Sequence, residues 1–147
     1  MTDVFEPSKR SSIMRCVRSE GNRATEVRLV AVFKACGIVG WRRRISLMGK
    51  PDFVFRRERI AVFVDGCFWH GCPLHGELPV NNVEYWRAKL ARNLKRDRFV
   101  NDVLRKAGWR VIRIWEHDLG RPDYVAGRIR RAFSLKRIAK MAKVRHP

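Results

Sequence analysis

The sequence predicts an α/β fold in which a mixed β-sheet of about four strands is flanked by helices. Three segments with strand-like apolar patterns follow one another between residues 41 and 64, and a fourth lies at 109–115. A long helical segment, 83–107, separates the third strand from the fourth, and a helical crossover of this kind joins parallel strands. The sheet is therefore expected to be mixed.

Two helices are expected before the sheet. The first is short and covers residues 8–17. The second runs from an N-cap at Asn22 to residue 36, and Gly37 is suited to end it. Its apolar stripe follows the i, i+3, i+4, i+7 spacing of an amphipathic helix: Leu29, Val32, Phe33 and Cys36.

The three consecutive strands differ in pattern. Trp41–Leu47 alternates apolar and basic residues, and Pro51–Phe55 forms the second strand. A tight charged turn at Arg56–Arg59 leads into Ile60–Val64, which is continuously apolar. Such a run is typical of a central strand covered on both faces.

The remaining segments complete the domain. Residues 66–82 are irregular, 83–107 are expected to be helical with at most one break, and Pro122 opens a last helix. We expect one domain, residues 1–127, followed by a basic C-terminal helix or tail, residues 128–147.

The charge indicates a polyanionic partner. The chain has 33 Lys and Arg against 14 Asp and Glu, a formal net charge of +19. Nucleic acid is the leading partner, an anionic membrane surface is the weaker alternative, and a solvated basic surface without a specific ligand is the simplest one. The longest apolar run has five residues, Ile60–Val64, whereas a membrane span needs about 20.

The first twelve residues contain no apolar signal-peptide core, so we expect the protein in the reducing cytoplasm. In that compartment closely spaced cysteines indicate a metal site before a disulfide. Cys67, Cys72 and His75 lie within nine residues and suit tetrahedral zinc, with His117 as the expected fourth ligand. His70 and His146 compete for that place, and a Cys67–Cys72 disulfide or two buried thiols are the alternatives.

Acidic residues indicate a second, hard-metal site. Asp52 stands near the start of a buried strand, where a carboxylate is costly unless it binds a cation. Glu26 projects from the apolar stripe of the second helix and needs a partner or a function, although the helix dipole also favours an acid in a first turn. Asp65 ends the central strand. This order is the layout of metal-dependent nucleases of the restriction-endonuclease type, although Asp65-Gly66-Cys67 lacks their usual lysine.

Other residues of the irregular segment point to DNA chemistry. His70, if it is free of metal, is suited to proton transfer near neutral pH. Aromatics that can wedge between base pairs, or that can simply close the core over the zinc loop, are Phe68 and Trp69 in this segment and Trp86 at the start of the long helix.

Taken together, these motifs resemble the very short patch repair (Vsr) DNA mismatch endonuclease family. The resemblance runs from about Ser12 to His117 and is most specific at Asp65-Gly66-Cys67-Phe68-Trp69-His70-Gly71. It also covers Ala24-Thr25-Glu26, Gly49-Lys50-Pro51-Asp52-Phe53, Glu84-Tyr85-Trp86, Asn93-Leu94-Lys95-Arg96-Asp97 and Gly108-Trp109-Arg110-Val111.

The resemblance implies a restriction-endonuclease-like core with a structural zinc and Mg²⁺-dependent nicking of one strand 5′ of the mispaired T in a T:G mismatch. Asp52 and the main-chain carbonyl of Val64 would bind magnesium. His70 would be the general acid or base, and Glu26 and Asp97 would orient water or His70. Phe68, Trp69 and Trp86 would match the intercalating aromatics.

The same resemblance implies action on double-stranded DNA at the bacterial nucleoid and a functional link to a cytosine-5 DNA methyltransferase. Because the sequence shows no heptad stripe, we expect a monomer. Familiar members have Thr-His where this chain has Val64-Asp65, so Asp65 could reach a metal instead. His75 takes the place of a more upstream His ligand of those members, and His117 stands where they commonly have a Cys. A zinc-stabilised DNA-binding module, or a related nuclease without T:G specificity, is the alternative.

Overall fold

The computed structural model describes residues 23–144, with side chains described from 24 to 137. The elements are α2 (Arg23–Ala35), β1 (Trp41–Arg42), β2 (Phe53–Phe55), β3 (Ile60–Asp65), α3 (Val83–Lys106), β4 (Arg110–Trp115), the short 3₁₀ helix η1 (Glu116–Gly120) and α4 (Pro122–Val144). The helix expected at 8–17 and the N-cap Asn22 lie outside the described residues.

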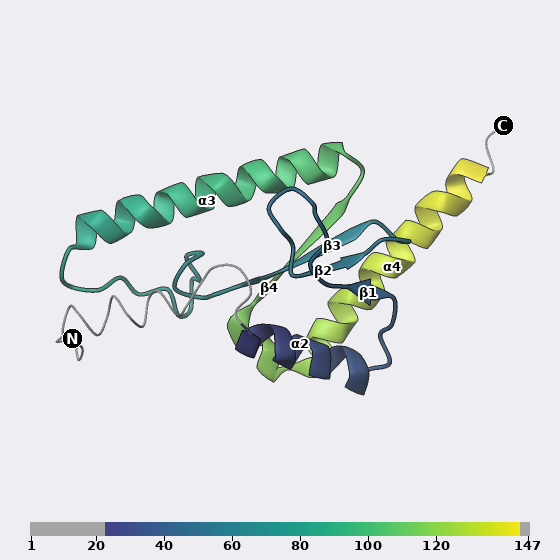
Figure 1. Ribbon diagram of the computed structural model, residues 1–147, viewed down its shortest axis with the longest axis horizontal. Coiled ribbons are helices and arrows are strands. Elements are labelled where there is room, and N and C mark those ends of the chain that lie inside the picture. The colour runs from purple at the N-terminus through teal and green to yellow at the C-terminus, as the bar shows by residue number, and fades with distance from the viewer. Residues whose placement is uncertain (1–22, 145–147) are drawn as a thin grey trace.

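The four strands form one mixed sheet in the order β1-β2-β3-β4, as expected. β1 and β2 pair antiparallel, as do β2 and β3, whereas β3 and β4 are parallel. The α3 crossover joins the parallel pair (Figure 1). Because β3 and β4 are in register from Ile60 and Arg110 to Asp65 and Trp115, both strands end at the same edge of the sheet.

Helices cover both faces of the sheet. α2 and α4 pack on one face, where the main core joins Leu29 and Phe33 to Phe53, Ile114 and Ile129. α3 crosses the other face over a smaller cluster that contains Phe63 and Leu104 (Figure 1). β3 is therefore central and covered on both sides, which its continuous apolar run predicted.

The predicted boundaries of the first two strands were wrong in two places. The first strand ends at Arg42 instead of Leu47, because Arg44 has a φ of 55° and turns the chain out of the extended conformation. The second strand begins at Phe53 instead of Pro51, because proline has no N–H for the ladder. Helix α3 is unbroken.

The last strand starts at Arg110, one residue later than expected, because the Trp109 N–H bonds to the Leu104 carbonyl at the end of α3. α4 begins at Pro122, as expected, and spans residue 127 as one helix, so the division of the chain there stays a prediction. Among the described helices, none has an apolar stretch long enough to cross a bilayer.

We predict that Phe33→Ala lowers the free energy of unfolding by about 3–5 kcal/mol. Phe33 is fully buried and its ring meets those of Trp41, Phe53 and Phe55 at centroid distances of 5.3–5.9 Å, so it joins α2 to the sheet. Urea unfolding followed by circular dichroism measures the loss. Val27→Ala on the exposed side of α2 is the control, and equal stability of the two variants would contradict the packing described.

Candidate active site

Asp52 lies where the β2–β3 ladder ends. The Val64 N–H donates to Asp52 Oδ2 at 2.7 Å. Extending the β2–β3 register would place Pro51 opposite Val64, and the Asp52 carboxylate accepts the hydrogen bond in place of a backbone partner. The side chain is thereby fixed at the edge of the sheet where β3 and β4 both end.

The Asp52 carboxyl group is held away from its ordinary ionisation. Burial raises its pKa to about 6, and the negative charges of Glu26 and Asp65 act in the same direction. The Val64 hydrogen bond and the charge of His70 oppose this rise. The His70 imidazole is therefore close enough to Asp52 for the two charges to interact. A cation placed here would favour the ionised carboxylate.

Glu26 has a partner, as the sequence required. Its carboxylate is bonded to the guanidinium of Arg43, which also lies 5.9 Å from the centre of the Phe53 ring. The partner comes from the segment after β1, so the contact ties α2 to the sheet. Although Glu26 is paired with Arg43, its negative charge still raises the pKa of Asp52.

His70 is oriented by two acids. Its Nδ1 lies 2.6 Å from Asp97 Oδ2 and 3.7 Å from Asp65 Oδ1. Arg113 completes the group with its Nη1 2.8 Å from Asp65 Oδ1 and 3.6 Å from Asp97 Oδ1. Burial also raises the pKa of the Asp65 carboxyl, against the lowering effects of His70 and Arg113.

The described acids at this edge differ in whether a basic side chain pairs with them. Glu26 is paired with an arginine, Asp65 with Arg113, and Asp97 with His70. Within residues 24–137, Asp52 forms no ion pair with a Lys, Arg or His side chain, and its close partner is a backbone N–H. Asp52 is therefore the carboxylate available for an added cation.

A polar stripe on α3 holds the site together. Asn93 donates to the Trp69 carbonyl at 3.0 Å, Asp97 bonds His70, and Asn101 accepts from Arg113 Nε at 2.9 Å. The three residues are spaced i, i+4, i+8 and so share one helix face. Sequence analysis missed Asn93, Asn101 and Arg113 as site residues. Their spacing was the available signal for the two asparagines, whereas Arg113 resembled an ordinary charge on a strand.

The predicted sulfur and nitrogen ligands meet at the same edge. Their candidate ligand atoms all lie within 4.8 Å of one another: Cys67, Cys72, His75 and His117. His117 Nδ1 is 3.3 Å from Cys67 Sγ and 3.6 Å from Cys72 Sγ, and His75 Nδ1 is 3.9 Å from Cys72 Sγ. Both cysteines are free thiols, so the expected alternative of a Cys67–Cys72 disulfide is wrong.

This donor set fits a zinc ion. Tetrahedral zinc, with Zn–S of about 2.3 Å and Zn–N of about 2.0–2.1 Å, separates its ligand atoms by roughly 3.3–3.8 Å. The Nε2 of His117 lies 3.4 Å from the buried carboxylate of Asp118, the kind of outer partner that orients a metal-binding imidazole. Burial raises the pKa of the Cys67 thiol, so metal binding would have to displace its proton. His70 points to the acids instead and does not join this cluster.

The three predicted DNA-facing aromatics gather in one cluster. Phe68 lies 5.1 Å from Trp69 and 5.4 Å from Trp86 between ring centroids, with the rings edge to face. Lys89 Nζ sits 4.9 Å from the Trp69 ring centre. Trp86 is only 9% exposed, so most of its ring is buried within the protein.

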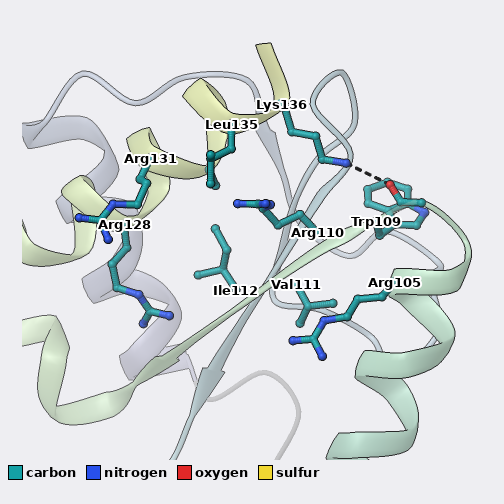
Figure 2. A pocket seen from close by; sticks show the side chains of 11 residues that line it. Arg105, Trp109, Arg110, Val111, Ile112, Arg128, Arg131, Leu135 and Lys136 are labelled. Carbon is teal, nitrogen blue, oxygen red and sulfur yellow. Dashed lines mark hydrogen bonds between the residues drawn. The ribbon is translucent and has the colours of Figure 1, made fainter. Parts of the chain in front are cut away.

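A cationic groove lies at the other end of β4, between α3 and α4 (Figure 2). It encloses about 630 Å³, and its charged lining residues are Arg105, Arg110, Arg128, Arg131 and Lys136. None of its described lining residues is acidic. Cations of this kind can hold backbone phosphates without reading sequence.

Comparison with known proteins gives a consistent result. The sequence model of the family described as "DNA mismatch endonuclease Vsr" matches residues 2–75. The chain is 44% identical to the type II nicking enzyme V.NaeI of Lentzea aerocolonigenes, over 74% of this chain and 68% of that protein. It is 36% identical to V.XorIIP of Xanthomonas oryzae pv. oryzae, over 88% and 96%. It is also 36% identical to the DNA mismatch endonuclease Vsr of Escherichia coli, over 79% and 74%.

The raised pKa of Asp52 predicts a pH-dependent stability. Since the carboxyl has a pKa of about 6 when folded and 3.8 as a free group, the folded state holds more protons between these values. Stability should therefore fall as pH rises through this window. Asp52→Asn, whose amide oxygen still accepts the Val64 N–H, should be more stable than the wild type at pH 7 by up to about 3 kcal/mol in magnesium-free buffer.

Urea unfolding of both proteins at pH 4 and pH 7 measures this difference, which should shrink at the lower pH. The exposed Asp102→Asn makes the same chemical change outside the site. An equal gain in stability from Asp102→Asn and from Asp52→Asn would contradict the assignment of the pH-dependent stability to Asp52.

Proposed function

Because this chain belongs to the family of Vsr DNA mismatch endonucleases, we propose that it nicks one DNA strand on the 5′ side of the mispaired T in a T:G mismatch, with Mg²⁺ as cofactor. Membership in this family shows that the chain is a DNA endonuclease. The alternative of a DNA-binding module without catalysis is thereby removed. The proposal concerns the preference for a T:G mismatch, the use of Mg²⁺ and the roles of the individual residues. The Asp52 carboxylate, which forms no ion pair with the other described residues, lies beside a His70 that is oriented by acids, and this arrangement supports the proposal.

Asp52 and the main-chain carbonyl of Val64 would hold the magnesium ion. In an antiparallel ladder the N–H and C=O of one residue face the same neighbouring strand. The Val64 N–H faces Asp52, so its carbonyl is expected to face the same end of β2. Carboxylate and carbonyl oxygens are the ligands that Mg²⁺ prefers. When bound there, the ion would neutralise the phosphate and lower the pKa of a coordinated water.

His70 would move the proton. Its Nδ1 faces Asp97, so Nε2 is the nitrogen left to face substrate. A carboxylate in this position fixes the tautomer and supports positive charge on the ring. Asp97 thus acts through His70, and Glu26, held by Arg43, would act through charge and water orientation near Asp52.

Phe68, Trp69 and Trp86 would enter the DNA beside the mismatch. In the free protein they pack on one another, so insertion exchanges ring–ring contacts for base stacking. Unstacking a base step costs a few kcal/mol and less where pairing is already weak, which would favour mismatched sites. Arg and Lys, including those of the cationic groove, would hold the phosphates.

Zinc would be structural. The cluster of Cys67, Cys72, His75 and His117 joins the loop after β3 to η1 after β4. All four positions are filled by protein atoms, and a closed ligand set leaves no position for a substrate. We also propose that the chain acts as a monomer on duplex DNA. Its substrate would arise from the action of a cytosine-5 DNA methyltransferase, because the methylated cytosine deaminates to thymine.

The decisive test is nicking of a labelled duplex that carries T:G, compared with its matched T:A form. We expect Mg²⁺-dependent cleavage of the T strand only. Asp52→Ala should bind the mismatched duplex without nicking it, and His70→Ala should slow nicking by about 10²–10⁴-fold. The exposed Asp102→Ala is the matched control.

Undiminished nicking by Asp52→Ala would remove the catalytic assignment. Equal cleavage of T:G and T:A duplexes would instead keep the nuclease and remove the mismatch specificity, which is the remaining alternative.

Metal analysis tests the zinc site. The purified protein should contain about one zinc per chain, and Cys72→Ser should lose it and melt at a lower temperature. Cys36→Ser, which changes a free thiol outside the cluster, should keep the metal. A Cys72→Ser protein with wild-type zinc content and melting temperature would refute the site.

A further inference from the structure

Arg113 is a partly buried cation between the two acids that flank His70. Its side chain is 20% exposed, and its Nη1 lies 2.8 Å from Asp65 Oδ1 and 3.6 Å from Asp97 Oδ1. It touches neither Asp52 nor the cysteine cluster in any contact between described residues. Neither the resemblance to the Vsr family nor the set of site residues predicted from the sequence assigns a role to Arg113.

The surrounding residues fix its guanidinium. In the parallel register Arg113 pairs with Phe63, two positions before the strand ends at Asp65. The guanidinium therefore reaches along the sheet, with its central carbon 4.3 Å from the centre of the Phe63 ring. Arg113 Nε donates to Asn101 on α3 at 2.9 Å, and its main-chain carbonyl accepts from Arg128 on α4 at 2.6 Å.

The distances show what Arg113 decides. His70 Nδ1 has two carboxylates within reach, Asp97 at 2.6 Å and Asp65 at 3.7 Å. The Asp65 oxygen that faces His70 is the one that accepts from Arg113. Charge-assisted bonds of this kind are short and directional, so this oxygen is engaged. Asp97 is left as the close acceptor for the imidazole.

We propose that Arg113 is a positioning residue that holds Asp65 away from His70. By doing so it keeps the Nδ1–H of His70 on Asp97, and with it the ring orientation that directs Nε2 to substrate. The inference deepens the proposed function, since it rests on His70 as the proton-transfer group. Without Arg113, the free Asp65 carboxylate competes for the imidazole, and the ring samples a second orientation in which Nε2–H, instead of Nδ1–H, is donated to a carboxylate.

The tautomer of His70 is a direct readout that does not depend on activity. In protein labelled with ¹⁵N-histidine, two-bond proton–nitrogen spectra at a pH where the ring is neutral report which nitrogen carries the proton. His70→Ala identifies the His70 signals by their loss. We expect the Nδ1–H form in the wild type, and in Arg113→Gln a shift of the His70 signals toward a mixture of both forms.

Kinetics provide the second readout. Arg113→Gln should lower the single-turnover nicking rate at saturating mismatched DNA by about 10- to 100-fold, as misplacement of a catalytic group does, with a much smaller change in Kd. Arg113→Lys, which keeps the cation, should recover part of the rate. Arg57→Gln, which removes an exposed arginine from the β2–β3 turn, is the matched control.

A double variant separates positioning from general damage to the fold. Asp65→Ala in the Arg113→Gln background removes both the competing carboxylate and the unpaired buried charge. Asp97 is then again the near acceptor, so the Nδ1–H form and much of the rate should return. This variant also serves if Arg113→Gln alone fails to fold.

The outcomes distinguish this inference from the proposed function. If Arg113→Gln leaves the His70 signals and the nicking rate unchanged, or if the double variant recovers neither, the positioning role is wrong. If His70→Ala nicks at the wild-type rate, the proposed function fails instead, while the tautomer comparison still decides whether Arg113 orients the ring.

Discussion

The site depends on the parallel pairing of β3 with β4. Because the two strands run together to Asp65 and Trp115, the loop that follows β3 and the 3₁₀ helix that follows β4 leave the sheet side by side. His117 is thereby brought to Cys67 across fifty residues of sequence. Asp52 lies at the same edge, because the antiparallel β2 begins where β3 ends. One register thus places the Asp52 carboxylate and the cluster of Cys67, Cys72, His75 and His117 at the same edge of the sheet.

Charge is arranged differently at this edge than over the rest of the molecule. The chain carries +19 overall, and the groove at the far end of β4 has cations but no acid among its described lining residues. At the site, carboxylates gather, and arginines from distant segments neutralise two of them, Glu26 by Arg43 and Asp65 by Arg113. Among the described residues, the close partner of Asp52 is the Val64 N–H and no basic side chain pairs with it, and burial raises its pKa to about 6. Such a carboxylate would bind a cation when anionic DNA is present at the site.

Features with local signatures could be predicted from the sequence. The apolar run Ile60–Val64 predicted a central strand, and the spacing of Cys67, Cys72 and His75 predicted a cluster, because both depend on neighbours in the chain. Features that depend on where a long side chain ends could not. Arg43 and Arg113 look like surface charges in the sequence, yet Arg43 reaches the partly buried Glu26 and Arg113 reaches the buried Asp65. The first strand was overestimated because its alternation continues past Arg44, whose positive φ ends it. His117 was found by elimination, but its outer partner Asp118 was not.

The position of the divalent ion tests this arrangement most directly. Crystals of the protein with a T:G duplex and Mn²⁺ in place of Mg²⁺, measured at the manganese absorption edge, would show the ion by its anomalous signal. We predict a peak coordinated by the Asp52 carboxylate and the Val64 carbonyl, with His70 nearby and Arg113 still bonded to Asp65. A peak between Asp65 and Asp97, with Asp52 left on its backbone N–H alone, would contradict it.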